Sequence, residues 1–389
     1  MGMKSRWACG VLAALLAIGL NACVTSNNGV GASSNTGFMW VTTQGDQMVS
    51  AFNINLSTGA VSKVGKSVAT GANPSAMAIS PNNGILFVAN TGSGSVNAYT
   101  VASDGSLTAL ASTPVGQSPM GLAVDPAGAF VFVANQGVFS DPTSGTVSVL
   151  TLSGSTFTTV TTVSTAGLGA AVSSGPVALA VDPTGKFLYV ANEFAGTVSA
   201  FSYDSTGHLT ELTPNSPYTV GANPSALAFS RTVSGTNRDN FLFVTNFASD
   251  TVNIFNACVA ASQTCANTPG LTPSGLLTSA GSVGAGSGPA GIVVDPALDF
   301  VYVLERKSSQ VSEFTFSPAT GGLSSLSSTA SVSGSPFSAG ITSNGNWVFA
   351  SNNSGSNLNE FAVGANGVLN IPTTSSIILT GQPSAILIR

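Results

Sequence analysis

Charged side chains are scarce in this sequence of 389 residues. They make up 6% of the chain, with 10 Lys and Arg against 15 Asp and Glu, whereas an ordinary soluble domain has about 25%. No basic patch is available to neutralise phosphate groups, which excludes a nucleic-acid partner. Gly, Ser, Thr, Asn and Ala supply the small and polar surface instead, a composition typical of a strand-and-turn protein that works outside the cytoplasm.

Histidine and cysteine are also rare. The one His is His208, and the sequence has no calcium loop, Gly-rich phosphate loop, metal-spaced His pair or Gly-x-Ser-x-Gly elbow. We therefore expect no metal ion and no cofactor. Of the four cysteines, Cys258 and Cys265 lie close together in a polar loop, where export favours a local disulfide between them. A metal site at this pair is disfavoured because no His accompanies it.

The amino terminus has the features of a targeting signal. Lys4 and Arg6 precede an apolar run from Trp7 to Leu20. This run is too short to span a bilayer comfortably and has the length of a secretory signal. The sequence therefore predicts an exported protein.

The end of the apolar run, Leu20-Asn21-Ala22-Cys23, resembles the lipobox of bacterial lipoproteins. The resemblance implies a signal peptide over residues 1–22, a lipidated Cys23 and a flexible tether over residues 23–36. The protein would then be extracytoplasmic and anchored to a bacterial membrane, either the outer membrane or one that faces the periplasm. A plain signal peptide and an uncleaved anchor are the alternatives.

One short phrase recurs along the chain: an aromatic residue, two small apolar residues and an Asn. Its clearest copies are Phe87-Val-Ala-Asn90, Tyr189-Val-Ala-Asn192 and Phe243-Val-Thr-Asn246, each followed by a Gly/Ser-rich gap and Val-x-x-aromatic. Self-similarity at this period indicates a repeat architecture. A second anchor is an apolar segment led by proline, which occurs seven times, at Pro74, Pro119, Pro176, Pro224, Pro289, Pro336 and Pro383.

Each repeat predicts four short strands, beginning with the proline-led segment. A turn such as Asp125-Pro-Ala-Gly128 follows it, and repeats of about 45 residues with this pattern indicate a β-propeller. The first unit, from Phe38, lacks a proline-led strand, and the last such strand, from Pro383 to Arg389, has nothing after it. We therefore predict an all-β, seven-bladed propeller over residues 37–389, closed by the C-terminal strand joining the N-terminal blade.

The phrases Tyr189-Val-Ala-Asn192 and Phe243-Val-Thr-Asn246 resemble the repeat known by the letters YVTN. The layout from Phe38 to Arg389 is similar to the seven-bladed lactonase propellers related to 6-phosphogluconolactonase. The resemblance implies the propeller fold and, as one activity, lactone hydrolysis. It is specific for the fold and weak for the activity, because many YVTN-type propellers are surface or binding proteins.

Ligands of propellers usually bind at the mouth of the central channel, on loops that a rigid scaffold carries. The loops before each proline and after each aromatic strand point to one such face. Five repeats have Asn at the end of the aromatic strand, which we interpret either as turn caps or as a ligand-binding funnel rim. These residues are Asn90, Asn135, Asn192, Asn246 and Asn352.

Charged residues gather in the same predicted zone. Glu193 and Arg306 hold the position after the Asn in two repeats, while Glu305 replaces the Asn itself and Lys307 follows Arg306. The group forms either a solvated rim with surface ion pairs or a funnel for an anionic or hydroxylated ligand. A lactone needs an activated water and a stabilised oxyanion, for which a Glu base and an Arg or Asn side chain suffice.

The stretch Asn192-Glu193-Phe-Ala-Gly-Thr-Val198 resembles the Asn-Glu-Leu-x-Ser-Thr-Val segment of phosphogluconolactonase-like propellers. That resemblance implies that Glu193 lines the funnel and that Arg306 serves as the anion-binding arginine. The sequence departs from the family in lacking the His and additional Arg residues around the funnel. The catalytic candidates are Glu193, Arg306 and Glu305.

Two other sets of polar residues have structural interpretations. His208 lies in a hairpin that we expect on the outer edge of its blade, at an ordinary surface position. Asp125, Asp182 and Asp295 come directly after proline-led strands, where an Asp side chain stabilises a turn.

Two functions follow from these features. The favoured one is a lipid-anchored propeller that binds a small ligand or an envelope protein without chemistry, with the loop from Gln136 to Gly145 and the Cys258–Cys265 insertion as partner contacts. The alternative is an extracytoplasmic lactonase that hydrolyses a sugar or aliphatic lactone at the central funnel. Convergence of Glu193, Glu305 and Arg306 on one ligand position would favour the enzyme.

Overall fold

The computed structural model describes residues 35–165, 172–230, 240–259, 274–372 and 377–389. These residues form strands and turns without helices, so no helix among them could span a membrane. The predicted signal peptide and Cys23 lie outside the described residues, as does all but the last part of the predicted tether. The predictions about them stay predictions.

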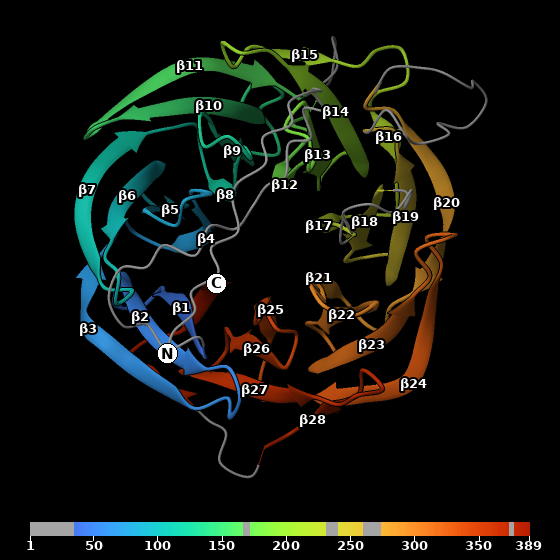
Figure 1. Ribbon diagram of the computed structural model, residues 1–389. Coiled ribbons are helices and arrows are strands. Elements are labelled where there is room, and N and C mark those ends of the chain that lie inside the picture. Colours follow the sequence, from blue (N-terminus) through green and yellow to red (C-terminus); the bar gives the residue numbers. More distant parts are fainter. Residues whose placement is uncertain (1–34, 166–171, 231–239, 260–273, 373–376) are drawn as a thin grey trace, which may run out of the picture. The chain divides into compact units, whose positions relative to one another are not determined.

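The strands form seven antiparallel sheets, which we number as blades from their innermost strands. Each inner strand begins at one of the seven prolines, and Figure 1 shows the blades arranged in a ring around a common centre. Blade 1 contains β4 (Pro74–Ile79), β5 (Ile85–Asn90), β6 (Ser95–Val101) and β7 (Leu107–Pro114). Blade 2 contains β8 (Pro119–Val124), β9 (Val131–Asn135), β10 (Thr146–Ser153) and β11 (Thr156–Ser164). Blade 3 contains β12 (Pro176–Val181), β13 (Phe187–Asn192), β14 (Thr197–Tyr203), β15 (Leu209–Glu211) and β16 (Tyr218–Thr219).

The remaining blades repeat the same order from the channel outward. Blade 4 contains β17 (Pro224–Phe229), β18 (Asn240–Asn246), β19 (Thr251–Ala257) and β20 (Leu277–Gly284). Blade 5 contains β21 (Pro289–Val294), β22 (Phe300–Glu305), β23 (Gln310–Phe316) and β24 (Leu323–Ser331). Blade 6 contains β25 (Pro336–Ile341), β26 (Trp347–Asn352), β27 (Asn357–Val363), β28 (Leu369–Asn370) and β29 (Ile377–Ile378). Blade 7 joins β30 (Pro383–Ile388) to β1 (Thr36–Thr43), β2 (Met48–Asn55) and β3 (Val61–Ala69).

Contacts between inner strands close the ring. Going around it, β4 contacts β8, then β12, β17, β21, β25 and β30 follow as successive neighbours, and β30 contacts β4 again. Blade 7 combines both ends of the chain: β30 pairs antiparallel with β1, and Phe38 and Arg389 exchange backbone hydrogen bonds of 2.6 and 2.8 Å. The predicted seven-bladed fold and its closure are therefore confirmed.

The hydrophobic core lies between neighbouring blades. The second strand of each blade is buried almost throughout, as in β13, because it has a sheet neighbour on each side and a blade on each face. Tyr189 of blade 3, for example, packs with Leu242 and Val244 of blade 4. Each such side chain contributes about 1.5–3 kcal/mol on burial. The interdigitated faces therefore hold every blade in a fixed orientation around the channel.

A register shift recurs at the start of every inner strand. In blade 1, Pro74 pairs with Asn90 and Ala76 with Ala89, so that Ser75 falls in a bulge. The Ser75 hydroxyl donates to the carbonyl of Pro119 in the next blade at 2.8 Å. A bulge re-aims the side chain it contains, and here it turns the second residue of the strand toward the channel.

The three turn aspartates have the expected structural role. Asp182 is buried and accepts hydrogen bonds from the backbone N–H groups of Lys186 and Phe187 at 2.7 and 2.6 Å. Asp125 and Asp295 are likewise buried and accept from backbone N–H groups of their own turns. These carboxylates therefore stabilise the turns after the inner strands.

Candidate functional site

The centre of the ring contains a cavity of about 350 Å³ that the inner strands of all seven blades line. This volume lies at the lower end of the range for small-molecule sites. The lining comes from the second, third and fourth residues of the inner strands, as in Ser75, Ala76 and Met77. The seven repeats therefore converge on one site.

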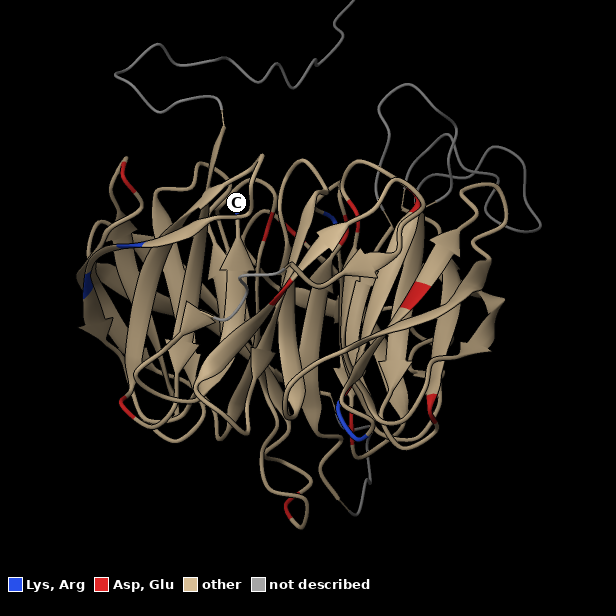
Figure 2. Cartoon of the chain, turned by 90° about the horizontal axis from the view of Figure 1, so that it is seen from below, with Lys and Arg blue, Asp and Glu red and all other residues tan. Residues whose placement is uncertain are grey.

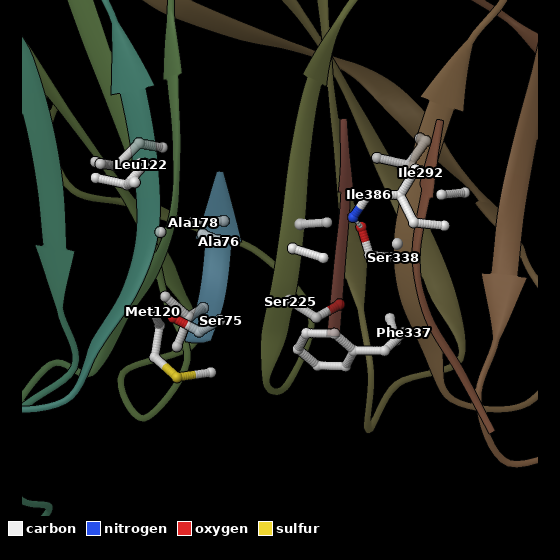
Figure 3. Close-up of a pocket in the computed structure, with 18 of the residues that line it drawn as sticks. Ser75, Ala76, Met120, Leu122, Ala178, Ser225, Ile292, Phe337, Ser338 and Ile386 are labelled. Carbon is white, nitrogen blue, oxygen red and sulfur yellow. Dashed lines mark hydrogen bonds between the residues drawn. The ribbon is translucent and has the colours of Figure 1, made fainter. Parts of the chain in front are cut away.

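The two ends of this cavity differ in chemistry. Figure 3 shows Ser75, Met120, Ser225 and Phe337 together near the start of their strands. Leu122, Ile292 and Ile386 lie toward the other end, with small alanines between. The end at the proline loops, which we call the mouth, is thus the more polar one.

Three residues that follow second strands also line the mouth: Glu193, Phe247 and Arg306, from blades 3, 4 and 5. The backbone N–H of each donates to a carbonyl in the loop that precedes the inner strand of the same blade. The acceptor of Glu193 is the Gly175 carbonyl, at 2.7 Å. Gly175 has a φ of +70°, and a Cβ there would lie 2.6 Å from the Phe194 ring, so only glycine fits. The backbone thus fixes where the Glu193 side chain starts.

Glu193 is half-buried and hydrogen-bonded to a neutral partner. Its Oε2 accepts from Nε2 of Gln136, across the boundary to blade 2, at 2.5 Å. Burial raises the pKa of Glu193 above the usual glutamate range, and the hydrogen bond from Gln136 offsets part of that rise. A carboxylate with a raised pKa in a cavity is suited to accept a proton near neutral pH.

Arg306 is positioned by one hydrogen bond and one aromatic ring. Its Nε donates to Oγ of Ser335 at 3.1 Å, and its guanidinium carbon lies 5.5 Å from the centre of the Phe337 ring. The neighbouring Lys307 is exposed and places Nζ 4.6 Å from the centre of the Phe247 ring. Cation–π contacts of this kind hold a cation over an aromatic face. Of the two cations, Arg306 is the one that lines the cavity.

Glu305 does not join Glu193 and Arg306, which corrects its assignment to the funnel. Its side chain is 2% exposed and accepts from the hydroxyls of Ser308 and Ser312 inside blade 5. Successive strand residues point to opposite sides. When Arg306 faces the cavity, Glu305 must therefore face the blade.

The five asparagines likewise lie inside the blades, so the funnel-rim interpretation is wrong for them. All are buried, and none lines the cavity. Each Nδ2 donates to a side chain on the next strand, as Asn192 does to Oγ of Ser199 at 2.9 Å. The turn-cap alternative describes Asn352, whose Oδ1 accepts from the N–H of Ser354 at 3.2 Å. The same Nδ2 bonding to the next strand occurs in Asn90, Asn135, Asn246 and Asn352.

The remaining candidates lie away from the cavity. His208 is exposed in the hairpin between β14 and β15, where its ring nitrogen is 2.8 Å from the Thr206 hydroxyl. Cys258 is disulfide-bonded, and its predicted partner Cys265 lies outside the described residues. Within those residues, no group of three or more His, Cys, Asp and Glu could hold a metal ion.

Sequence reasoning overlooked Gln136, the hydrogen-bond partner of Glu193, and two aromatic residues at the mouth, Phe247 and Phe337. Gln136 occupies the same repeat position as Glu193, yet its hydrogen bond across the blade boundary has no signature in the sequence. Phe337 had a detectable signal, because it is the one aromatic residue at the second position of the seven proline-led strands. The other six positions hold Ser75, Met120, Val177, Ser225, Ala290 and Ser384.

Comparison with known proteins gives one family and several structural neighbours. The family described as "Lactonase, 7-bladed beta-propeller" matches residues 38–170, 141–261 and 261–387. A putative 6-phosphogluconolactonase from Bacteroides fragilis superposes with a TM-score of 0.76 at 19% identity, covering 93% of this chain and 100% of that one. A periplasmic gluconolactonase from Pseudomonas aeruginosa gives 0.74 at 20% identity, covering 91% and 99%. No curated protein matches the chain in sequence, and at these identities the structural likeness shows the fold.

Proposed function

The chain belongs to the lactonase family of seven-bladed β-propellers, and from this premise we propose that it opens a lactone ring by hydrolysis at the channel mouth. The observation that carries the proposal is that Glu193 and Arg306, from separate blades, line the same cavity. One supplies a base and the other a cation, the two groups that the reaction needs. The lactonase names of the neighbours support a lactone as the substrate class.

In the proposed reaction, Glu193 takes a proton from a water molecule as that water attacks the lactone carbonyl carbon. The Arg306 guanidinium stabilises the negative charge that develops on the carbonyl oxygen. When the tetrahedral intermediate collapses, the ring C–O bond breaks and the leaving oxygen takes the proton from Glu193. One water is consumed, and the product is a hydroxy acid. Gln136 orients the carboxylate through its 2.5 Å hydrogen bond.

We also propose that this reaction takes place outside the cytoplasm on a protein anchored through Cys23. The support is the amino-terminal sequence, Lys4 and Arg6 before an apolar run that ends at Cys23. The neighbour described as a periplasmic gluconolactonase is in keeping with this location. A lactone without phosphate suits such a location better than a phosphorylated metabolite.

Binding without turnover is the second candidate function. It is favoured by the loop around Phe139, whose ring is 55% exposed and packs edge-on against Phe194 at 5.3 Å. Val138 beside it is 48% exposed. Exposed apolar residues on a loop next to Glu193 offer a contact for an envelope protein.

The test is an assay of the purified full-length chain against glucono-δ-lactone and γ-butyrolactone, with Glu193→Gln, Arg306→Ala and a Lys307→Ala control. We expect Glu193→Gln to lower kcat about 10²-fold or more and Arg306→Ala to lower it by about 10²- to 10³-fold. Lys307→Ala should retain activity, because Lys307 is adjacent in sequence but does not line the cavity. Absence of turnover in a folded sample would reject hydrolysis of these lactones and favour binding alone.

A further inference from the structure

Beyond the mouth, large apolar side chains line the channel wall. Leu122, Leu179 and Ile292 line the cavity. Their large apolar side chains are half-buried and so remain partly accessible to a ligand. Met77 and Ile386 extend this surface on neighbouring blades. Figure 3 shows Leu122 and Ile292 on opposite sides of the cavity. A ligand that enters this part of the cavity therefore loses contact with water and contacts apolar side chains on more than one side.

The hydroxyl groups of Ser75 and Ser225 near the mouth and of Ser338 farther in already have partners within the ring. Ser75 donates to the Pro119 carbonyl at 2.8 Å, and Ser225 donates to the Pro289 carbonyl at 2.7 Å. The hydroxyl oxygen of Ser338 accepts from the backbone N–H of Ile386 at 3.0 Å, as the dashed line in Figure 3 marks. A polyhydroxylated ligand loses hydrogen bonds to water that such a wall does not replace. This surface therefore favours a ligand with few hydroxyls.

Charge at the mouth also limits the ligand. Figure 2 shows how few charged residues the described strands carry. Those lining the cavity are one carboxylate, Glu193, and one guanidinium, Arg306. A phosphate dianion would face a single cation and, in the same cavity, an anion. An uncharged lactone with one carbonyl oxygen matches this pair better.

We propose that the substrate is a lactone that carries an alkyl chain, with its ring at the mouth beside Glu193 and Arg306 and its alkyl chain along Leu122 and Ile292. This inference rests on the proposed hydrolytic function and names the substrate class for the same cavity. Leu122 and Ile292 contact the alkyl chain and set the preference for its length. Each methylene transferred from water to this wall should increase kcat/KM by about threefold to fourfold.

The experiment compares γ-butyrolactone, γ-octalactone, γ-decalactone and glucono-δ-lactone as substrates of the full-length chain. The channel variant is Leu122→Gln, which replaces the branched apolar end of the side chain with a polar amide. The matched control is Leu110→Gln, since Leu110 on β7 is also half-buried but lies outside the cavity. If all six added carbons of γ-decalactone reach the wall, we expect kcat/KM to rise about 10³-fold from γ-butyrolactone, and we expect Leu122→Gln to flatten that rise mainly through KM. Leu110→Gln should leave it unchanged.

The outcomes separate this inference from the function on which it rests. Turnover of glucono-δ-lactone in preference to γ-decalactone would overturn the alkyl-chain inference and leave lactone hydrolysis standing. If no lactone is hydrolysed, calorimetry with 4-hydroxydecanoate, the ring-opened form of γ-decalactone, replaces the kinetic readout. Binding that Leu122→Gln weakens more than tenfold and Leu110→Gln leaves intact would then support an alkyl-chain site without hydrolysis. Absence of binding would overturn the inference.

Discussion

Blades 3 and 5 both carry a glutamate where the second strand ends, yet the two carboxylates lie in different environments. In blade 3 the strand ends in Asn192, and Glu193 follows it into the cavity. In blade 5 the glutamate is Glu305 itself, which points into the blade, and Arg306 takes the cavity position. A shift of one residue in a strand reverses the direction of a side chain. Repeat position therefore decides which charged residue can meet a ligand.

The partners of the two glutamates differ accordingly. Glu305 accepts hydrogen bonds from Ser308, Ser312 and the backbone N–H of Ser287, which together satisfy a buried carboxylate. Glu193 has the Gln136 amide as its partner and remains half-buried beside the cavity. Saturation with donors is typical of a structural carboxylate. Partial desolvation next to an open volume is typical of a reactive one.

Removal of the closing strand should have the largest effect, because it opens the ring that positions both glutamates. Deletion of residues 383–389 removes β30, leaves β1 without its inner partner and opens one wall of the cavity. We expect cooperative unfolding to be lost or the melting temperature to fall by more than about 15 °C. Calorimetry measures this, and an unchanged melting temperature would contradict the closed ring.

Truncation of Glu305 should cost stability and leave catalysis intact. Glu305→Ala leaves the buried Ser312 hydroxyl without its acceptor, for an expected loss of about 2–3 kcal/mol in the free energy of unfolding. Glu305→Asn should recover most of it, because Asn192 donates to Ser199 from the same position and Ser312 corresponds to Ser199. Urea unfolding measures both variants. A drop in kcat with unchanged stability would instead place Glu305 in the chemistry.

Loss of the amide beside Glu193 should shift the pH dependence of the reaction. In Gln136→Leu the hydrogen bond that lowers the pKa of Glu193 is absent while burial still raises it. The base then stays protonated to higher pH, so the acid limb of kcat should move to higher pH. Turnover at acidic pH should fall by about fivefold to tenfold. The control is Gln117→Leu, on an exposed residue of a neighbouring loop. Identical pH profiles for the two variants would show that Gln136 does not lower the pKa of Glu193.

The smallest effect is expected for Glu360, a partly buried carboxylate that does not line the cavity. Glu360 on β27 flanks Gly59 of blade 7, and burial raises its pKa to about 7. The folded state therefore binds this proton more tightly than the unfolded state, whose glutamates titrate near about 4.3. The stabilisation from this tighter proton binding is complete below the unfolded pKa of about 4.3. It is lost as the pH rises through the folded pKa of about 7. Glu360→Gln should flatten this dependence and gain about 1 kcal/mol at alkaline pH, after allowance for solvent screening; urea unfolding across this pH range measures it.

Much of the fold could be predicted because each blade repeats the same phrase. The proline-led strand and the aromatic strand recur with Asn or its substitute at a fixed place. Residues at the same place in the repeat were therefore expected at the same place in each blade. The unmatched ends at Phe38 and Pro383 indicated how the ring closes. Equivalence of blades also grouped Glu193 with Arg306, and the structure places both on one cavity.

The features that could not be predicted from the sequence are side-chain directions and contacts between blades. The Asn position and the position after it are adjacent in sequence, and the pattern did not show which of them faces the channel. Glu305 and the asparagines were therefore placed on the wrong side. The bond from Gln136 to Glu193 crosses between blades over 57 residues of sequence, and no local pattern records such a pair.

We propose that Glu193, and not Glu305, acts on the substrate. The most direct test is to measure kcat for lactone hydrolysis in Glu193→Gln and Glu305→Asn side by side, with the melting temperature of each. We expect Glu193→Gln to retain its melting temperature and lose about 10²-fold or more in kcat, and Glu305→Asn to retain kcat. Full turnover by Glu193→Gln, with either result for Glu305→Asn, would contradict it.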